Sequence, residues 1–302
     1  RRQVGNLMTS ILDVRNVSRR FPGVVALDDV SLSIEPGQVH ALVGENGAGK
    51  STLINIISGV LAPDEGEILL EGKPAGLTDP VTARQKGIVT VHQEAELFPT
   101  LSVAENMALG TGLPRTSLGR VRWNEVHNRA ERAVAPLGHH LDVRAPASQL
   151  SVAERHLTQV AAAVVEKAKI VILDEPTSVL TLKETEWLFQ QIDRLKSQGV
   201  GIIYISHRQE EIFRLSNTIT VLRDGKVVWN GPTSSVDSAG LVQHMVGRAM
   251  DLPTRRLDAK VSDNMGPVRL RVRAATDPRH RYRDINLELR AGEVFGLYGL
   301  VG

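Results

Sequence analysis

The fold of this chain is decided by the segment Val39-His40-Ala41-Leu42-Val43-Gly44-Glu45-Asn46-Gly47-Ala48-Gly49-Lys50-Ser51-Thr52. Its first five residues are mostly apolar and predict a short strand, and the glycines that follow predict a loop before a helix. Residues 44–51 match the pattern G-x-x-x-x-G-K-[ST] at every specified position. The segment therefore predicts a strand, a phosphate-binding loop and the beginning of a helix.

The residue types of this loop suit a bound phosphate. Glycines tolerate left-handed backbone, so successive N–H groups can turn toward an anion at the positive end of a helix dipole. Lys50 supplies a charge for the β- and γ-phosphates, and the Ser51 hydroxyl suits Mg²⁺. The alternative, a glycine-rich turn with a solvated lysine, is disfavoured by the flanking patterns. We expect the nucleotide to contact Gly44, Asn46, Gly47, Ala48, Gly49, Lys50, Ser51 and Thr52.

The composition indicates a globular protein, since 42% of the 302 residues are hydrophobic. The 36 basic and 34 acidic residues are interspersed, so nucleic acid is not an expected partner. No apolar run approaches the roughly 18 to 20 residues of a membrane-spanning helix, and residues 1–7 are too polar for a signal peptide. We expect a cytoplasmic protein in which residues 1–9 are an N-terminal extension. The absence of cysteine is compatible with this location.

The residues around the loop predict an antiparallel β-layer. Residues 11–14 and 30–34 alternate in polarity as strands do, and residues 19–23 read as a turn. Phe21 lies beside that turn, where its ring can stack on an adenine or simply join the core. Further strand patterns at 66–73 and 87–93 follow the first helix, and the second ends on Gln93.

The region from about 94 to 165 predicts an inserted helical subdomain. Strand patterns disappear, and residues 103–109, 124–136 and about 150–165 read as helices. Ser151 and Glu154 have the S-x-x-E spacing of a capping box at the start of the third helix.

Two buried strands then end in polar residues. The apolar run 170–173 is typical of a strand buried on both faces of a parallel sheet, and it ends in Asp174 and Glu175. Residues 200–206 form a second such strand, which ends on His207. Ligands bind at the carboxyl ends of parallel strands, where one carboxylate can hold Mg²⁺ and another can orient or deprotonate a water. The sequence therefore predicts a nucleotide hydrolysis site.

The last part of the chain repeats the first. After a hairpin through Asp224-Gly225 and a helix capped by Gly247, residues 248–267 read as a linker. The segment 284–289 then matches 29–34, and the glycines at 292, 299 and 302 match those at 37, 44 and 47. We expect residues 10–247 to form one nucleotide-binding domain and 268–302 to be the incomplete start of a second.

The order of these motifs resembles the ATP-binding subunits of ABC transporters over residues 10–247. The resemblance implies an α/β P-loop NTPase fold with an antiparallel β subdomain, a RecA-like parallel-sheet core and an inserted helical subdomain. It implies that Lys50 holds the β- and γ-phosphates, that Ser51, Gln93 and Asp174 surround Mg²⁺, and that Glu175 is the general base. His207 and Gln93 would complete the catalytic set, with Phe21 at the adenine, and 178–181 would be the D-loop. Ser151 would cap the phosphate bound by the opposite domain.

Finer features are similar to the fused tandem ATPases of bacterial monosaccharide importers of the ribose, xylose, galactose and arabinose type. These features are Gly-Glu-Asn-Gly-Ala-Gly-Lys in the loop, residues 93–106, and Tyr-Ile-Ser-His-Arg at 204–208. The resemblance implies ATP hydrolysis that energises sugar import. The implied partners are the transmembrane subunits of a permease, docked near 93–106, a periplasmic sugar-binding protein, and a second nucleotide-binding domain or a homodimer partner. The implied location is the inner face of the cell membrane.

One segment departs from the family pattern. Val152-Ala153-Glu154 stands where the family usually has Gly-Gly-Gln, so close approach to a phosphate on the opposite domain is less favourable here. Three alternatives stay open: a ribosome- or DNA-associated ABC-type ATPase, a GTPase-type switch, and a weakly catalytic regulatory module. The near-neutral charge argues against the first, and the absence of Asn-Lys-x-Asp against the second.

Overall fold

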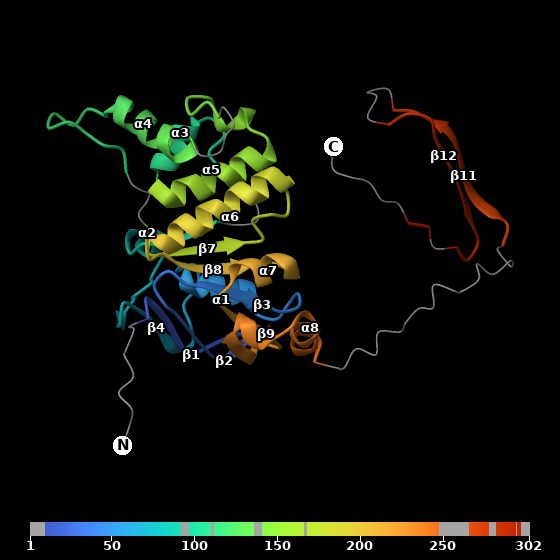
Figure 1. Ribbon diagram of the computed structural model, residues 1–302, viewed down its shortest axis with the longest axis horizontal. Helices are drawn as coiled ribbons and strands as arrows, with labels where there is room; N and C mark the ends of the chain where they lie inside the picture. The colour runs from blue at the N-terminus through green and yellow to red at the C-terminus, as the bar shows by residue number, and fades with distance from the viewer. Residues whose placement is uncertain are drawn as a thin grey trace, which may run out of the picture. The chain divides into compact units, whose positions relative to one another are not determined.

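The computed structural model describes residues 10–91, 97–109, 112–135, 141–165, 168–247, 266–277, 282–293 and 295–296. The chain divides into two units, Arg1–Ala249 and Met250–Gly302 (Figure 1). The first unit carries the phosphate loop and the predicted catalytic residues. The second contains a single described hairpin.

The centre of the first unit is a six-stranded sheet in the order β10-β9-β3-β8-β7-β6. All neighbours are parallel except β9 and β10. The carboxyl ends of β3, β8 and β7 therefore lie at one edge of the sheet. The strands are β3 (Val39–Val43), β6 (Ile88–Val91), β7 (Ile170–Asp174), β8 (Gly201–Ile205), β9 (Thr218–Arg223) and β10 (Lys226–Pro232).

The sheet is buried on both faces, as the apolar run at 170–173 predicts. Val171 and Leu173 of β7 join a core cluster shared with helices on one face, and Ile170 and Ile172 join a second cluster on the other. All four are completely buried. Because successive side chains of a strand point to opposite faces, one uninterrupted apolar run anchors both layers.

Helices cover the sheet and form the predicted helical subdomain. In that subdomain, α3, α4 and α5 contact one another, and α5 also packs against α6 and β6 (Figure 1). Ser102 begins α3 with a capping box to Glu105. The helices are α1 (Lys50–Ile57), α2 (Pro80–Gln85), α3 (Val103–Ala108), α4 (Trp123–Val134), α5 (Val152–Val165), α6 (Leu182–Ser197), α7 (Gln209–Leu215) and α8 (Ser238–Val246), with short 3₁₀ turns at Ala147–Gln149 and Thr233–Ser235.

The predicted antiparallel layer is a four-stranded sheet in the order β2-β1-β4-β5. Its strands are β1 (Leu12–Phe21), β2 (Val24–Ile34), β4 (Glu65–Leu70) and β5 (Lys73–Pro74). The interpretation of residues 19–23 as a turn was wrong for its first part. Residues 19–21 continue β1 past an irregularity near Asn16, because they pair with 24–27 of β2. The turn itself occupies only Pro22 and Gly23.

The remaining expected elements lie close to their predicted positions. The β9–β10 hairpin turns at Asp224-Gly225, and Gly247 ends α8 with φ 74° in the left-handed region. Helices α2 and α7 were not anticipated. Within the described ranges, none of the helices has both the length and the apolar character needed to cross a membrane.

The second unit contains a hairpin of β11 (Val268–Ala275) and β12 (Ile285–Arg290) with the same pairing as β1 and β2. Leu270 faces Leu289 as Leu12 faces Ile34, and the register shift between Val272 and Ala275 corresponds to the one between Val14 and Val17. The repeat seen in the sequence is therefore also a repeat of strand register.

Candidate functional site

The phosphate loop is held by close backbone contacts at two of its glycines. Gly44, Gly47 and Gly49 all have positive φ angles, of 154°, 84° and 105°. A Cβ atom at Gly44 would lie 2.3 Å from the carbonyl oxygen of Leu222, and one at Gly49 would lie 2.6 Å from that of Ala26. Any side chain at these two positions would displace the loop. A Cβ at Gly47 would meet no atom within 4 Å, so glycine is favoured there only by the positive φ angle.

The loop leads into α1 with its first backbone N–H groups available. Gly49 is the N-cap of α1, no side chain caps the helix, and its first turn contains no acidic residue. The first N–H groups of a helix have no partner within the helix, and the helix dipole makes this end attractive to anions. The end of the loop can therefore accept a phosphate group.

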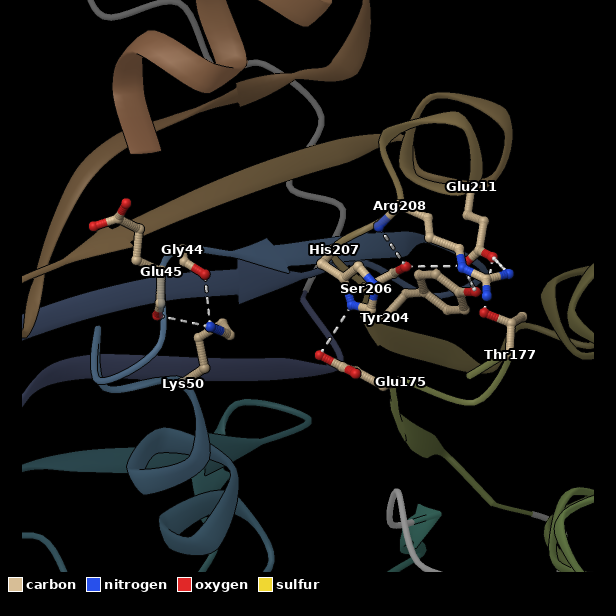
Figure 2. A network of polar contacts seen from close by, with 10 residues as sticks. All are labelled: Gly44, Glu45, Lys50, Glu175, Thr177, Tyr204, Ser206, His207, Arg208 and Glu211. Atoms are coloured by element: carbon tan, nitrogen blue, oxygen red, sulfur yellow. Dashed lines mark hydrogen bonds and ion pairs between the residues drawn. The ribbon is translucent and has the colours of Figure 1, made fainter. Parts of the chain in front are cut away.

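Lys50 is folded back over the loop (Figure 2). Its Nζ donates to the carbonyl oxygens of Gly44 at 2.7 Å and Glu45 at 3.0 Å. Burial lowers the pKa of Lys50, and the negative charges of Glu175 and Asp174 act in the opposite direction. The lysine therefore lies within electrostatic reach of both carboxylates, although they are far away in the sequence.

The paired strands β7 and β8 bring Glu175 and His207 together. Nδ1 of His207 lies 3.3 Å from Oε1 of Glu175 (Figure 2). Glu175 adopts a left-handed conformation with φ 48°, which costs a non-glycine residue about 1–2 kcal/mol. This turn begins directly after β7, where the Glu175 amide still donates to the carbonyl of Ile205 at 2.9 Å. A strained backbone thus directs this carboxylate toward the histidine.

The other predicted nucleotide contacts of the loop lie as expected along 44–52. Asn46 and Ser51 are exposed, Thr52 is half-buried, and Ala48 is buried with its carbonyl accepting from the Gly225 amide at 3.2 Å. The same turn contacts β2, since the Asp28 amide donates to the Gly225 carbonyl at 2.8 Å. The β9–β10 turn therefore fixes the phosphate loop against the antiparallel sheet, a contact that the sequence did not reveal.

Phe21 ends β1 with part of its ring accessible to solvent. The ring is 38% exposed, and the guanidinium carbon of Arg19 lies 5.1 Å from its centroid. Arg19 is itself held by Asp64, whose Oδ1 is 2.6 Å from Nη1. The alternative of a fully buried core phenylalanine is excluded by this exposure. A flat ligand could stack on the ring, and the arginine would lend positive charge to that stack.

Ser151 is the first residue before α5, and its polar groups form the predicted capping box. Its Oγ accepts from the Glu154 amide at 3.2 Å, and its amide donates to the Glu154 carboxylate at 2.7 Å. Ser151 is exposed, but the contacts described for it stay within its own helix. The structure of one chain therefore does not bring Ser151 to the phosphate loop.

Gln93 lies outside the described residues, as do 92–96 around it. Within the described part of the chain, no group of three or more His, Asp or Glu side chains is arranged to hold a metal ion. Ser51 and Asp174 nevertheless offer oxygen atoms, one at the start of α1 and one at the end of β7. Mg²⁺ commonly takes only one or two protein ligands together with phosphate and water, and this pair suits that mode.

Sequence reasoning missed a polar cluster behind the Glu175–His207 pair. Glu211, on the unanticipated helix α7, is buried and accepts hydrogen bonds from Thr177, Tyr204 and Ser206 (Figure 2). Burial raises the pKa of Tyr204, and the charge of Glu211 adds to this effect. The sequence does show a glutamate four residues after His207. Its contact with this site can be inferred only when the segment is known to be a helix.

A groove separates the helical subdomain from the sheet. Its volume is about 310 Å³, and its rim exposes the apolar side chains of Val60, Val81, Phe98 and Leu109. Asn106 fixes one wall, since its side-chain amide donates to the carbonyls of Phe98, Leu101 and Ser102 at 3.0–3.2 Å. This groove borders the segment that the sequence predicted as a docking surface.

Comparison with known proteins gives consistent results. Residues 27–178 match the model of the ABC transporter family. The chain is 45% identical over 292 residues to ribose import ATP-binding protein RbsA 2 of Rubrobacter xylanophilus, covering 97% of this chain and 55% of that protein. It is 41% identical to a putative ribose/galactose/methyl galactoside import ATP-binding protein of Ralstonia nicotianae, covering 97% and 55%. The chain thus spans about half the length of these relatives.

Solved structures support the same assignment. The fold resembles an ATP-binding cassette of an ABC transporter, MJ1267, solved in its ADP conformation. The TM-score is 0.66 at 25% identity, over 79% of this chain and 99% of that one. The expected fold is confirmed: a P-loop core with a parallel sheet, an antiparallel β subdomain and a helical insertion. The resemblance drawn from the motifs is also confirmed, and the chain belongs to the ABC transporter family.

Proposed function

We propose that residues 10–247 form a nucleotide-binding domain that binds Mg-ATP and hydrolyses it. The observation that carries this proposal is the contact between Glu175 and His207, within electrostatic reach of a lysine-bearing phosphate loop. These groups are the ones that nucleotide hydrolysis requires: a cradle for phosphates, a base for water and a polar group for the transferred phosphoryl.

Lys50 and the start of α1 would bind the β- and γ-phosphates. In the ligand-free chain, Nζ is held by the Gly44 and Glu45 carbonyls. Phosphate oxygens would take over these hydrogen bonds and would pair a half-buried positive charge with a negative one. Binding therefore replaces two neutral acceptors by charged ones, which is favourable.

Glu175 would act as the general base. Its carboxylate accepts a proton from the water that attacks the γ-phosphate, and His207 holds the carboxylate on one side while its own ring contacts the γ-phosphate. In a dissociative transfer the protein contributes much through positioning and charge stabilisation, so Glu175 has to be held at a fixed place as well as accept the proton.

Mg²⁺ would be held by Ser51, Asp174 and Gln93. When bound, the ion neutralises charge on the β- and γ-phosphates. Ser51 is exposed in the first turn of α1, so its hydroxyl is free to face both the ion and solvent. Burial lowers the pKa of Lys50, and the charge of Asp174 offsets part of this effect.

The adenine would stack on Phe21. Arg19 covers part of the ring, and the exposed remainder accepts the base. Residues 24–27 connect this position to the loop, because the Ala26 carbonyl oxygen and a Leu27 methyl group lie 2.6 Å and 2.8 Å from the place that a Cβ of Gly49 would take. The β1–β2 hairpin would thus bind the adenine, and the phosphate loop packed against that hairpin would bind the phosphates.

The biological role proposed for this activity is to energise import of a sugar through an ABC permease at the inner face of the cell membrane. Two relatives at 41–45% identity are named as a ribose import ATP-binding protein and a putative ribose/galactose/methyl galactoside import ATP-binding protein. The groove rimmed by Val60, Val81, Phe98 and Leu109 is the proposed docking site for the permease's cytoplasmic helices. Exposed apolar side chains around a cavity are typical of such an interface. A periplasmic sugar-binding protein would supply the solute.

A second nucleotide-binding domain is the proposed partner for the other wall of the site. The hairpin of β11 and β12 repeats the register of β1 and β2, which supports 268–302 as the start of that domain and 248–267 as the linker. Ser151 would contact the phosphate bound by this partner, or by a second copy of the chain. Rapid ATP turnover by a demonstrably monomeric sample would contradict the composite site.

Nucleotide binding by the chain tests the proposal. We expect Mg-ATP to bind to the wild type, measured by isothermal titration calorimetry, and Lys50→Ala to weaken binding at least about tenfold through the loss of a charged hydrogen bond. Lys169→Ala, which removes an exposed lysine paired with Glu71, is the matched control and should bind like the wild type. Equal binding by Lys50→Ala and the wild type would refute the assignment of the loop.

A further inference from the structure

The carboxylate of Glu211 joins two chain segments behind the site. Oε2 accepts from the hydroxyls of Tyr204 and Ser206, each at 2.8 Å, and Oε1 accepts from the hydroxyl of Thr177 at 2.8 Å. Nη1 of Arg208 lies 3.4 Å from Oε1. The Glu211 side chain is 8% exposed. Several donors thus converge on one buried acceptor (Figure 2).

The two segments are those that carry the Glu175–His207 pair. Thr177 follows Glu175 by two residues, and Ser206 directly precedes His207. The backbone ladder between β7 and β8 ends at this point, since the last bond runs from the Glu175 amide to the Ile205 carbonyl. Beyond that bond the two segments continue without strand pairing, and Glu211 joins them through side chains.

From these contacts we infer that Glu211 is a positioning residue, which holds Thr177 and Ser206 at fixed places and thereby sets the geometry of Glu175 against His207. The inference rests on the function proposed above for that pair. A buried carboxylate is suited to the task because it accepts from several hydroxyls at once, and each oxygen serves a different segment.

The left-handed backbone conformation of Glu175 has to be held in place by contacts such as those that Glu211 makes. A non-glycine residue leaves this conformation when its surroundings do not hold it there. The turn that follows is short, with the Ser178 amide donating to the Glu175 carbonyl at 3.2 Å. Holding Thr177 fixes the far side of this turn. Loss of the Thr177 bond would let Glu175 relax away from His207.

The test compares Glu211→Gln with Glu186→Gln in the full chain. An amide at 211 carries no charge and has one accepting oxygen in place of two, so the charge-assisted bond to one segment is lost or replaced by a weaker one of reversed direction. Glu186 is the matched control, because it is a carboxylate on α6 that binds Arg214 of α7 outside the site. We expect Glu211→Gln to lower kcat for ATP about tenfold or more at an ATP affinity within about twofold of the wild type. Glu186→Gln should change neither.

A second readout does not depend on turnover. The imidazole NMR signals of His207, identified by their loss in His207→Ala, report the contact with Glu175. We expect Glu211→Gln to shift these signals, and Glu175→Gln to shift them in the same direction. Unchanged His207 signals and unchanged kcat in a folded Glu211→Gln chain would overturn the inference.

Milder variants keep the test decisive if Glu211→Gln does not fold. Thr177→Val removes one donor at nearly constant volume, and Thr177→Ser restores the hydroxyl. We expect Thr177→Val to shift the His207 signals and Thr177→Ser to return them to their wild-type positions. Equal signals in all three chains would contradict the inference. A wild-type chain that binds no Mg-ATP would instead refute the proposed function, while the NMR comparison would still decide the role of Glu211.

Discussion

The hairpins of the two units have the same register and differ in burial. Leu12 of β1 is completely buried, and its counterpart Leu270 of β11 is 50% exposed. Both hairpins place a residue with positive φ at the same irregularity, Asn16 in one and Ala274 in the other. Local sequence therefore sets the pairing, while the layers packed on the hairpin set its contribution to stability. Within the described residues, only the first hairpin contributes to a core cluster.

The largest expected contrast is between Leu12→Ala and Leu270→Ala. Removing the buried side chain of Leu12 leaves a cavity in the core cluster that it belongs to, and should lower the free energy of unfolding of the first unit by about 2–5 kcal/mol. Leu270→Ala should change it by less than about 0.5 kcal/mol, as expected for an exposed position. Urea unfolding of both chains measures this difference. Equal losses would mean that the two hairpins share one core.

The next contrast concerns His40, whose counterpart in the repeat is Phe295. Burial lowers the pKa of His40 to about 4, against about 6.5 in an unfolded chain. The neutral ring is thus favoured in the fold, so its stabilisation is present above pH 6.5 and is lost as the pH falls toward 4. The loss should reach about 3 kcal/mol.

The substitution His40→Phe, which copies the repeat, should remove this acid sensitivity. Unfolding free energies measured between pH 4 and 7 would fall less steeply in the variant than in the wild type. The same steepness in both chains would show that other groups cause the loss.

A smaller contrast is expected at the glycines that end each hairpin. Gly37 and Gly292 both have positive φ angles, of 71° and 82°. A Cβ at Gly37 would lie 2.9 Å from the Lys196 carbonyl oxygen, whereas nothing lies within 4 Å at Gly292. We expect Gly37→Ala to lower the free energy of unfolding of the first unit by about 1–3 kcal/mol, because backbone strain and the close contact add. Gly292→Ala meets the backbone strain alone and lies in the second unit, so it should leave the free energy of unfolding of the first unit unchanged. A similar effect of both would contradict the assigned difference in packing.

The smallest effect should be the same in both hairpins. The Asn16 amide donates to Oγ of Ser31 at 2.8 Å, and the Ala274 amide donates to Oδ1 of Asn286 at 2.9 Å. Ser31→Ala and Asn286→Ala should each raise hydrogen exchange at the respective amide by an amount equivalent to about 1 kcal/mol. A change in one hairpin only would break the structural equivalence of the two bulges.

The sequence was sufficient for the parts of this fold that local chemistry determines. The loop at 44–51, the two-faced strand at 170–174 and the cap at Ser151 each follow from spacing and residue type. Helix α7 could not be anticipated, because a helix of only seven residues is not stable by itself. It depends on the packing of Ile212 and Leu215 against the sheet. The role of Glu211 depended on that helix. Long-range contacts, such as Gly225 with the phosphate loop, leave no local signal.

The central claim is that Lys50 binds nucleotide while Glu175 performs chemistry. Glu175→Gln tests it most directly, with ATP affinity and phosphate release measured on the same samples. We predict an affinity within about twofold of the wild type and a rate of release at least about 100-fold lower, because the amide cannot accept the proton of the attacking water. An unchanged rate of release, or a loss of ATP binding equal to that in Lys50→Ala, would contradict the account.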